Sequence, residues 1–171
     1  MAAVKWLFVT VWLGLLPVAH ASEAALEGLS REVAERVVAL DRAIEACDAQ
    51  KRSASPAALQ RDRLVTLGIE REAVMGAVMY LGQRNDYRCA RRPLADLLLA
   101  STLLDNARKA YGQPPLGYPD TLAALTQPDV RYFELEAAYG RLSPDARAYL
   151  AAQYGETPFD ALTVIKGLPE Y

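Results

Sequence analysis

Residues 63–72 read RLVTLGIERE, and the glycine inside this stretch decides how the chain folds back on itself. The surrounding residues, 56–84, otherwise show one helical pattern, and a straight helix of that length would span about 42 Å. Gly68 can end a helix and adopt the left-handed conformation that a reversal of the chain requires. The sequence therefore predicts two helices here, with a turn close to Gly68.

The two cysteines, Cys47 and Cys89, are the reason for expecting that turn. A disulfide needs its two Cα atoms within about 7 Å of each other. If helix 56–84 were straight, Cys47 would lie near one end of it, and the residues leading to Cys89 cover at most about 18 Å from the other end. With the turn, we expect a Cys47–Cys89 bond. In the chain-entropy model of loop closure, this bond stabilises the folded state by about 4 kcal/mol. Two buried thiols or an intermolecular bridge are the alternatives.

The first 21 residues have the three parts of a secretion signal. Lys5 supplies the positive charge, residues 6–16 (WLFVTVWLGLL) form an uncharged apolar run, and residues 19–21 (AHA) offer the small residues that signal peptidase accepts. An uncleaved membrane anchor is the alternative, but the apolar run is shorter than the roughly 20 residues that span a membrane. We therefore expect an exported protein, periplasmic or extracellular, whose mature chain, 22–171, has no transmembrane segment.

The mature chain is predicted to be all-α, a single-domain helical bundle of about five to seven helices stapled by the disulfide. Ser55, Ser143 and Thr157 each precede a proline, a pattern typical of a helix start. Helices are predicted over the following ranges: 23–50, 56–84 with its break, 93–111, a short turn after Asp120, 128–139, 144–154 and 158–166.

Residues 112–119 (GQPPLGYP) are the clearest connector and separate a long-helix half, 22–111, from a short-helix half, 120–171. Both halves are expected to share one core. Residues 94–111 (LADLLLASTLLDNARKAY) are apolar on more than one face, which predicts the most buried helix of the domain. Gly76 and Gly82 are expected to allow close helix packing.

Composition excludes several classes of function. The single histidine, His20, lies inside the predicted signal, so the mature chain would hold none. That loss removes Ser-His-Asp and Cys-His catalysis and the commonest transition-metal ligand. A formal net charge of −2 argues against nucleic-acid binding. We therefore predict no catalytic residue, no metal ligand and no cofactor.

Residues 84–92 (RNDYRCARR) are the densest charged feature of the chain. Next to the start of helix 93–111, guanidinium groups and free backbone N–H groups together can hold a carboxylate or a phosphate. The alternative is a solvated loop whose arginines pair with Asp86, Asp96 and the acidic residues of the first helix. The candidate binding residues are Arg84, Tyr87, Arg88, Arg91 and Arg92.

Tyrosine is concentrated in the last third of the chain, and most of these rings are expected to fill the core. Tyr118, inside the proline-rich connector, is the tyrosine expected to be exposed, and it joins the candidate binding residues.

These features favour an exported binding or accessory protein that acts through protein–protein contact with another envelope or exported protein, inhibitor and immunity-type roles included. One alternative is a binder of a small anionic or amphipathic ligand held between helices. The other is a cell-wall hydrolase that uses Asp or Glu, although no carboxylate pair marks such a site.

Overall fold

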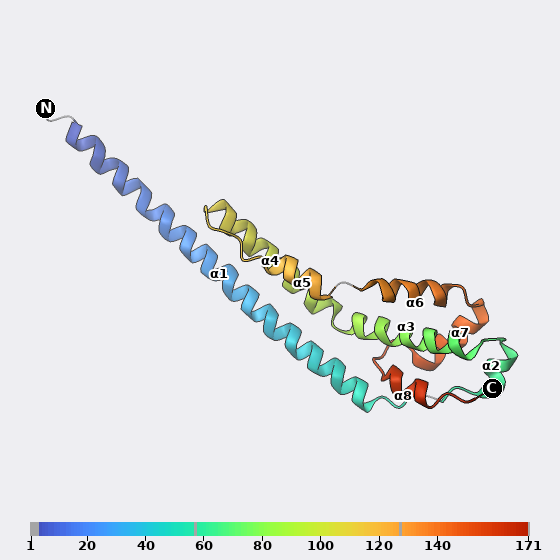
Figure 1. Cartoon of the computed structure of the whole chain (residues 1–171). Coiled ribbons are helices and arrows are strands. Elements are labelled where there is room, and N and C mark those ends of the chain that lie inside the picture. The colour runs from blue at the N-terminus through green and yellow to red at the C-terminus, as the bar shows by residue number, and fades with distance from the viewer. Residues whose placement is uncertain (1–3, 57, 127, 171) are drawn as a thin grey trace. The chain divides into compact units, whose positions relative to one another are not determined.

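The computed structural model describes the backbone of residues 4–56, 58–126 and 128–170, and the side chains of 23–56, 58–123 and 128–170. Eight helices and no strand run through these residues (Figure 1). The helices are α1 (Val4–Ser53), α2 (Arg61–Thr66), α3 (Arg71–Cys89), α4 (Arg91–Ala110), α5 (Tyr118–Thr126), α6 (Val130–Gly140), α7 (Pro144–Tyr154) and α8 (Ala161–Lys166). The all-α prediction is confirmed. The eight helices of the described residues are one more than the upper end of the predicted range of about five to seven.

The chain divides into two compact units, and each combines segments that are distant in sequence. Unit 1 comprises the chain up to Ala39 together with Ala95–Leu125. Unit 2 comprises Leu40–Leu94 and Thr126–Tyr171. Each unit therefore takes residues from both sides of the connector 112–119. The expectation that 22–171 is one domain stays a prediction.

In unit 1, an ion pair joins α1 and α4. The Arg36 guanidinium lies 4.0 Å from the Asp96 carboxylate. Within α4, the buried Asp105 accepts hydrogen bonds from the backbone N–H groups of Leu116 (2.7 Å) and Gly117 (3.1 Å), which follow the helix. This carboxylate holds the chain in the tight return that leads into α5.

The prediction that 94–111 is the most buried helix is wrong. Leu97 and Leu104 are buried, but Leu99 and Leu103 on another face of α4 are exposed. The apolar residues of α4 do lie on more than one face, and unit 1 covers one of them. More residues are buried on α3, in the core of unit 2.

The core of unit 2 is organised around α3, which contacts α6, α7 and α8. Figure 1 shows α6 running alongside α3. Gly82 lies where α3 meets α8: a Cβ placed on it would come within 2.9 Å of the Ala161 Cβ. Glycine at this position therefore permits the close approach that the sequence predicted. Fully buried side chains of this core include Leu64, Val74, Val78, Leu81 and Leu150.

The turn between α2 and α3 lies where the sequence predicted it. Gly68 has φ +62°, in the left-handed region, and follows the end of α2. The chain reverses there, and the predicted pairing of Cys47 with Cys89 is confirmed as a disulfide with its Cα atoms 6.0 Å apart. The bond ties the end of α1 to the end of α3.

The predicted helix starts have mixed outcomes. Ser143 is the N-cap of α7 and accepts a hydrogen bond from the Ala146 N–H, with Pro144 in the first turn. The starts predicted at Ser55 and Thr157 are wrong, because α2 begins at Arg61 and α8 at Ala161. Proline fixes φ at a value that turns and extended segments also use, so a hydroxyl before proline does not by itself start a helix.

The predicted signal segment, 1–21, lies outside the residues whose side chains the structure describes. Over the part of the chain that was described, no helix combines the length and the apolar character needed to cross a membrane.

Candidate functional site

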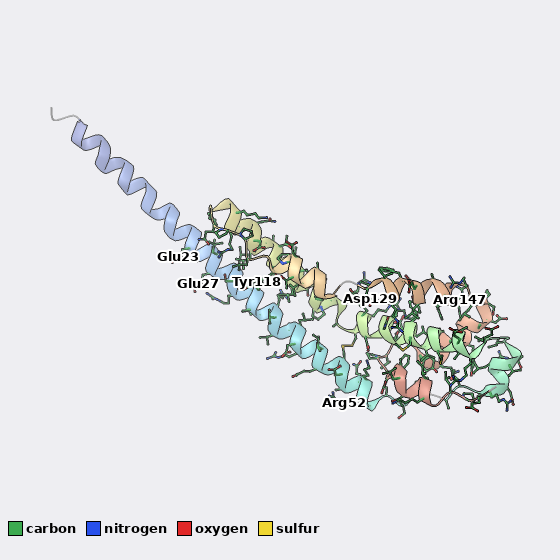
Figure 2. The ribbon with its side chains drawn as sticks, in the orientation of Figure 1. Glu23, Glu27, Arg52, Tyr118, Asp129 and Arg147 are labelled. Atoms are coloured by element: carbon green, nitrogen blue, oxygen red, sulfur yellow. A yellow bond between two sulfur atoms is a disulfide. The ribbon has the colours of Figure 1, made fainter. Side chains whose placement is uncertain are left out.

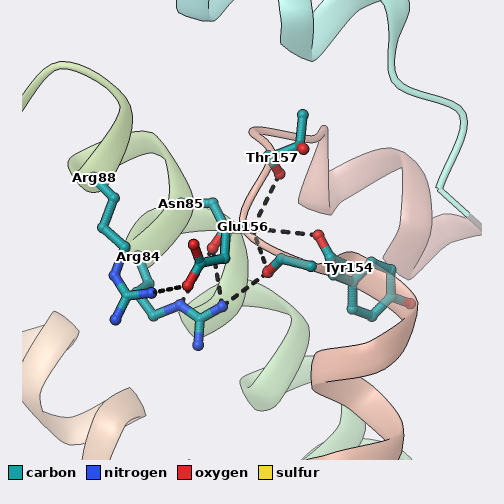
Figure 3. Close-up of polar contacts among 7 residues, drawn as sticks. Arg84, Asn85, Arg88, Tyr154, Glu156 and Thr157 are labelled. Carbon is teal, nitrogen blue, oxygen red and sulfur yellow. Dashed lines mark hydrogen bonds and ion pairs between the residues drawn. The ribbon is translucent and has the colours of Figure 1, made fainter.

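Two residues of the predicted arginine cluster, Arg84 and Arg88, lie in the C-terminal half of α3. Both contact the loop after α7 (Figure 3). The Arg84 guanidinium donates to the backbone carbonyl of Gly155 (3.0 Å) and to the Asn85 side-chain oxygen (3.0 Å). Asn85, which is fully buried, donates its amide to the carbonyl of Thr157 (3.0 Å). These groups satisfy carbonyls at the end of α7, so their role in the fold is structural.

Arg88 also faces this loop, through an ion pair with Glu156 (2.9 Å). The alternative expectation, in which the arginines pair with Asp86 and Asp96, does not describe these contacts. Asp86 is bound by Lys51 (2.6 Å), and Asp96 lies beside Arg36.

The remaining predicted binding residues lie apart from that loop. Arg91 and Arg92 are exposed in the first turn of α4 and form no ion pair with any of the described residues. Tyr118 belongs to unit 1, where it begins α5 and is exposed (Figure 2). Arg84 and Arg88, both on α3, thus contact the same loop, the one after α7. No single point is shared by all the predicted arginines.

Beside Arg84 and Arg88, α3 and α6 build a cluster of aromatic rings that runs from the core to the surface. Tyr80 is buried, with its ring centroid 5.0 Å from that of Tyr139 and 5.6 Å from that of Tyr132. Tyr132 in turn lies 6.3 Å from Tyr87 and 5.7 Å from Phe133, which it meets edge to face. Such tilted and edge-on contacts are favourable for aromatic rings.

The outer end of this cluster is open to solvent. Tyr87 is 38% exposed, Phe133 54% and Val130 74%. Val130 and Phe133 are three residues apart on α6 and so share one side of the helix. We call Tyr87, Val130, Tyr132 and Phe133 the aromatic surface.

Burial raises the pKa of two tyrosines of the aromatic cluster, Tyr80 and Tyr87. Burial, followed by the hydrogen bond from the Tyr80 hydroxyl to Glu136 (3.1 Å), raises the pKa of Tyr80 to about 12. Burial also raises the pKa of Tyr87. Tyr80 and Tyr87 therefore keep their hydroxyl protons at neutral pH and well above it.

Sequence reasoning found Tyr87 but missed Val130, Tyr132 and Phe133. The available signal was the apolar pattern of α6, where Tyr132, Leu135 and Tyr139 form one stripe and Val130 and Phe133 form a second. The first stripe packs against the core, whereas the second is exposed. Periodicity alone does not say which of two stripes is covered.

Across the described residues, no three His, Cys, Asp or Glu side chains gather as a metal site would require. What the arrangement can do is present flat apolar rings beside guanidinium groups, a combination typical of contact surfaces. Comparison of the chain with protein-family models, with curated proteins and with solved structures finds no match.

Proposed function

We propose that this is an exported binding protein that acts through protein–protein contact, and that it uses the aromatic surface of unit 2 to do so. The observation that carries the proposal is the exposure of Tyr87, Val130 and Phe133 at the end of a packed aromatic cluster. Interface hot spots are rich in tyrosine and arginine and lie on rigid, preorganised supports. Here the support is the ring pair of the buried Tyr80 and the partly buried Tyr139.

Charged side chains next to the aromatic surface supply the polar rim that an interface needs. Arg131 and Glu134 are exposed neighbours on α6, and Arg88 follows Tyr87 on α3. Aromatic side chains at the centre and charged ones at the edge match the composition of stable but non-obligate interfaces. The partner that fits is a folded protein with a complementary apolar pocket, and export would place that partner in the envelope or outside the cell. The disulfide is compatible with such an oxidising compartment.

The first experiment compares two baits in an envelope extract, the wild-type chain and the double variant Tyr87→Ala/Phe133→Ala. Captured proteins are purified and their affinity is measured with each bait. Because both side chains are exposed, the double variant should fold normally. It should bind the partner at least about tenfold more weakly, since a hot-spot residue contributes about 2 kcal/mol or more and about 1.4 kcal/mol corresponds to a factor of ten.

Tyr111→Ala is the matched control, because Tyr111 is 48% exposed but belongs to unit 1. It should bind as the wild type does. A third bait with alanine at Arg88, Arg91 and Arg92 tests the contribution of the arginines. Capture of no partner, or equal affinity of wild type and double variant for the captured one, would refute the aromatic surface as the binding site.

A further inference from the structure

Unit 1 contains a cavity that the proposed function does not use. It has a volume of about 560 Å³ and lies between α1, α4 and α5. Small-molecule sites typically have volumes of roughly 300–1,000 Å³, so this cavity has the size of a ligand site.

The lining of the cavity is apolar and uncharged. Val33 of α1, Leu97 and Leu104 of α4 and Leu116 before α5 supply aliphatic walls. No Asp, Glu, Lys or Arg is found among the described residues that line it. Moving a charged group out of water into such a space would cost several kcal/mol, so the chemistry of the walls selects an uncharged occupant.

One polar group inside the lining has no partner. Ser101 is 1% exposed, and its hydroxyl forms no hydrogen bond with the described residues of the protein. By contrast, two other lining hydroxyls are bonded: Ser30 donates to the Leu26 carbonyl and Thr121 to the Gly117 carbonyl. A buried hydroxyl without a partner is costly and rare in folded proteins, which indicates that something else bonds to it.

We propose that this cavity binds a small, uncharged and mostly apolar molecule with one hydrogen-bonding group, a hydroxyl or a carbonyl, that meets the Ser101 hydroxyl. The aliphatic walls hold the apolar body of the molecule. The cavity is open to solvent, so the molecule can enter it directly: the exposed residues of the lining are Ser30, Ala34, Val37, Leu116, Tyr118 and Thr121. The site is independent of the aromatic surface, which belongs to unit 2.

The test is a fluorescence titration of the full chain with Nile red, an uncharged dye that carries a carbonyl group, followed by its displacement with 1-decanol. Ala34→Phe places a large ring at the lining and should abolish dye binding. Ala39→Phe is the matched control on the same helix, exposed and outside the lining, and should bind as the wild type does. The variant Tyr87→Ala/Phe133→Ala should also bind normally, which separates this site from the aromatic surface.

Ser101→Ala tests the polar contact without filling the cavity. It should weaken binding of both dye and decanol about fivefold, as expected for one lost hydrogen bond, while leaving the melting temperature of the free protein unchanged or higher. Failure of the wild type to bind the dye, or equal binding by wild type and Ala34→Phe, would overturn the proposal. So would sedimentation data in which the wild type is a dimer and Ala34→Phe is a monomer, because a second copy of the chain would then occupy the cavity.

Discussion

Asn85 ties the loop after α7 to the core of unit 2, together with Arg84. Asn85 is fully buried, and its amide reaches the carbonyls of Tyr154 (3.4 Å), Gly155 (3.3 Å) and Thr157 (3.0 Å). Replacing it with an apolar residue would leave the Tyr154 and Thr157 carbonyls without this donor, whereas the Gly155 carbonyl would keep its bond from Arg84. A buried acceptor without a partner costs about 1–3 kcal/mol.

We therefore expect Asn85→Ala to lower the free energy of unfolding by about 1–3 kcal/mol. Urea denaturation followed by circular dichroism measures this change. Asn106→Ala is the control, because Asn106 is an exposed asparagine in α4. The structural role of Asn85 would be disproved if both variants had the same stability.

At the scale of the helices, replacing either of two glycines of α3 with alanine should change the free energy of unfolding, but in opposite directions. A Cβ on Gly82 would lie 2.9 Å from the Ala161 Cβ, whereas one on Gly76 would lie 3.8 Å from Leu135, an ordinary contact. Gly82→Ala should push α8 away from α3 and lower the free energy of unfolding by about 1–3 kcal/mol. Gly76→Ala should instead raise it by up to about 1 kcal/mol, because alanine favours the helix. Thermal melts of both variants show whether each substitution raises or lowers the melting temperature. A change in the same direction for both variants would contradict the close packing of α3 on α8.

The contact of α3 with α6 makes the stability of unit 2 sensitive to alkali. In the folded protein the pKa of Tyr80 is raised to about 12, compared with 10.0 for an unperturbed tyrosine. Between these values the unfolded chain has lost the proton that the folded chain keeps. The stabilising effect is therefore complete below pH 10 and is lost as pH rises toward 12.

The expected result is a melting temperature that falls over this pH interval, and falls less steeply in Tyr80→Phe. Tyr154, whose pKa burial also raises, is present in both proteins and contributes equally. Melting curves recorded at half-unit pH steps provide the comparison. Identical slopes for the two proteins would mean that Tyr80 does not carry the effect.

For the whole molecule, the disulfide is the one covalent link between segments that lie far apart in the chain. Cys47 and Cys89 are separated by 42 residues, and closing a loop of that length stabilises a fold by about 4 kcal/mol in the chain-entropy account. The double variant Cys47→Ala/Cys89→Ala should lose a comparable amount in urea denaturation. Intact mass under non-reducing conditions is the direct check, and two free thiols in the wild type would rule out the bond.

The helices and the disulfide were predictable because local chemistry determines them. Gly68 ends α2 by its own conformational freedom, and the reach of the chain then brings Cys47 to Cys89. Ser143 caps α7 through a contact three residues away. Such short-range arguments need no knowledge of the rest of the fold.

The arrangement of the two units and the aromatic surface were not predictable, because they depend on which helix covers which stripe. Leu97 and Leu99 look alike in sequence, yet one is buried and the other exposed. The arginines stood out by composition, but the partner of Arg88, Glu156, follows it by 68 residues. No spacing rule connects residues so far apart.

The interleaving of the two units has a consequence for the order in which the chain can fold during its synthesis. The core of unit 2 joins Leu64, Val74 and Leu81 to Leu150 and Leu168. The ribosome releases Leu64, Val74 and Leu81 long before Leu168. Until then, these side chains lack part of the core against which they pack. The core of unit 2 therefore stays incomplete, and its early segment open to chaperone binding, until residues near Leu168 have been made. Under the proposed export, such late closure would give a translocation channel time to accept the chain while it can still be threaded.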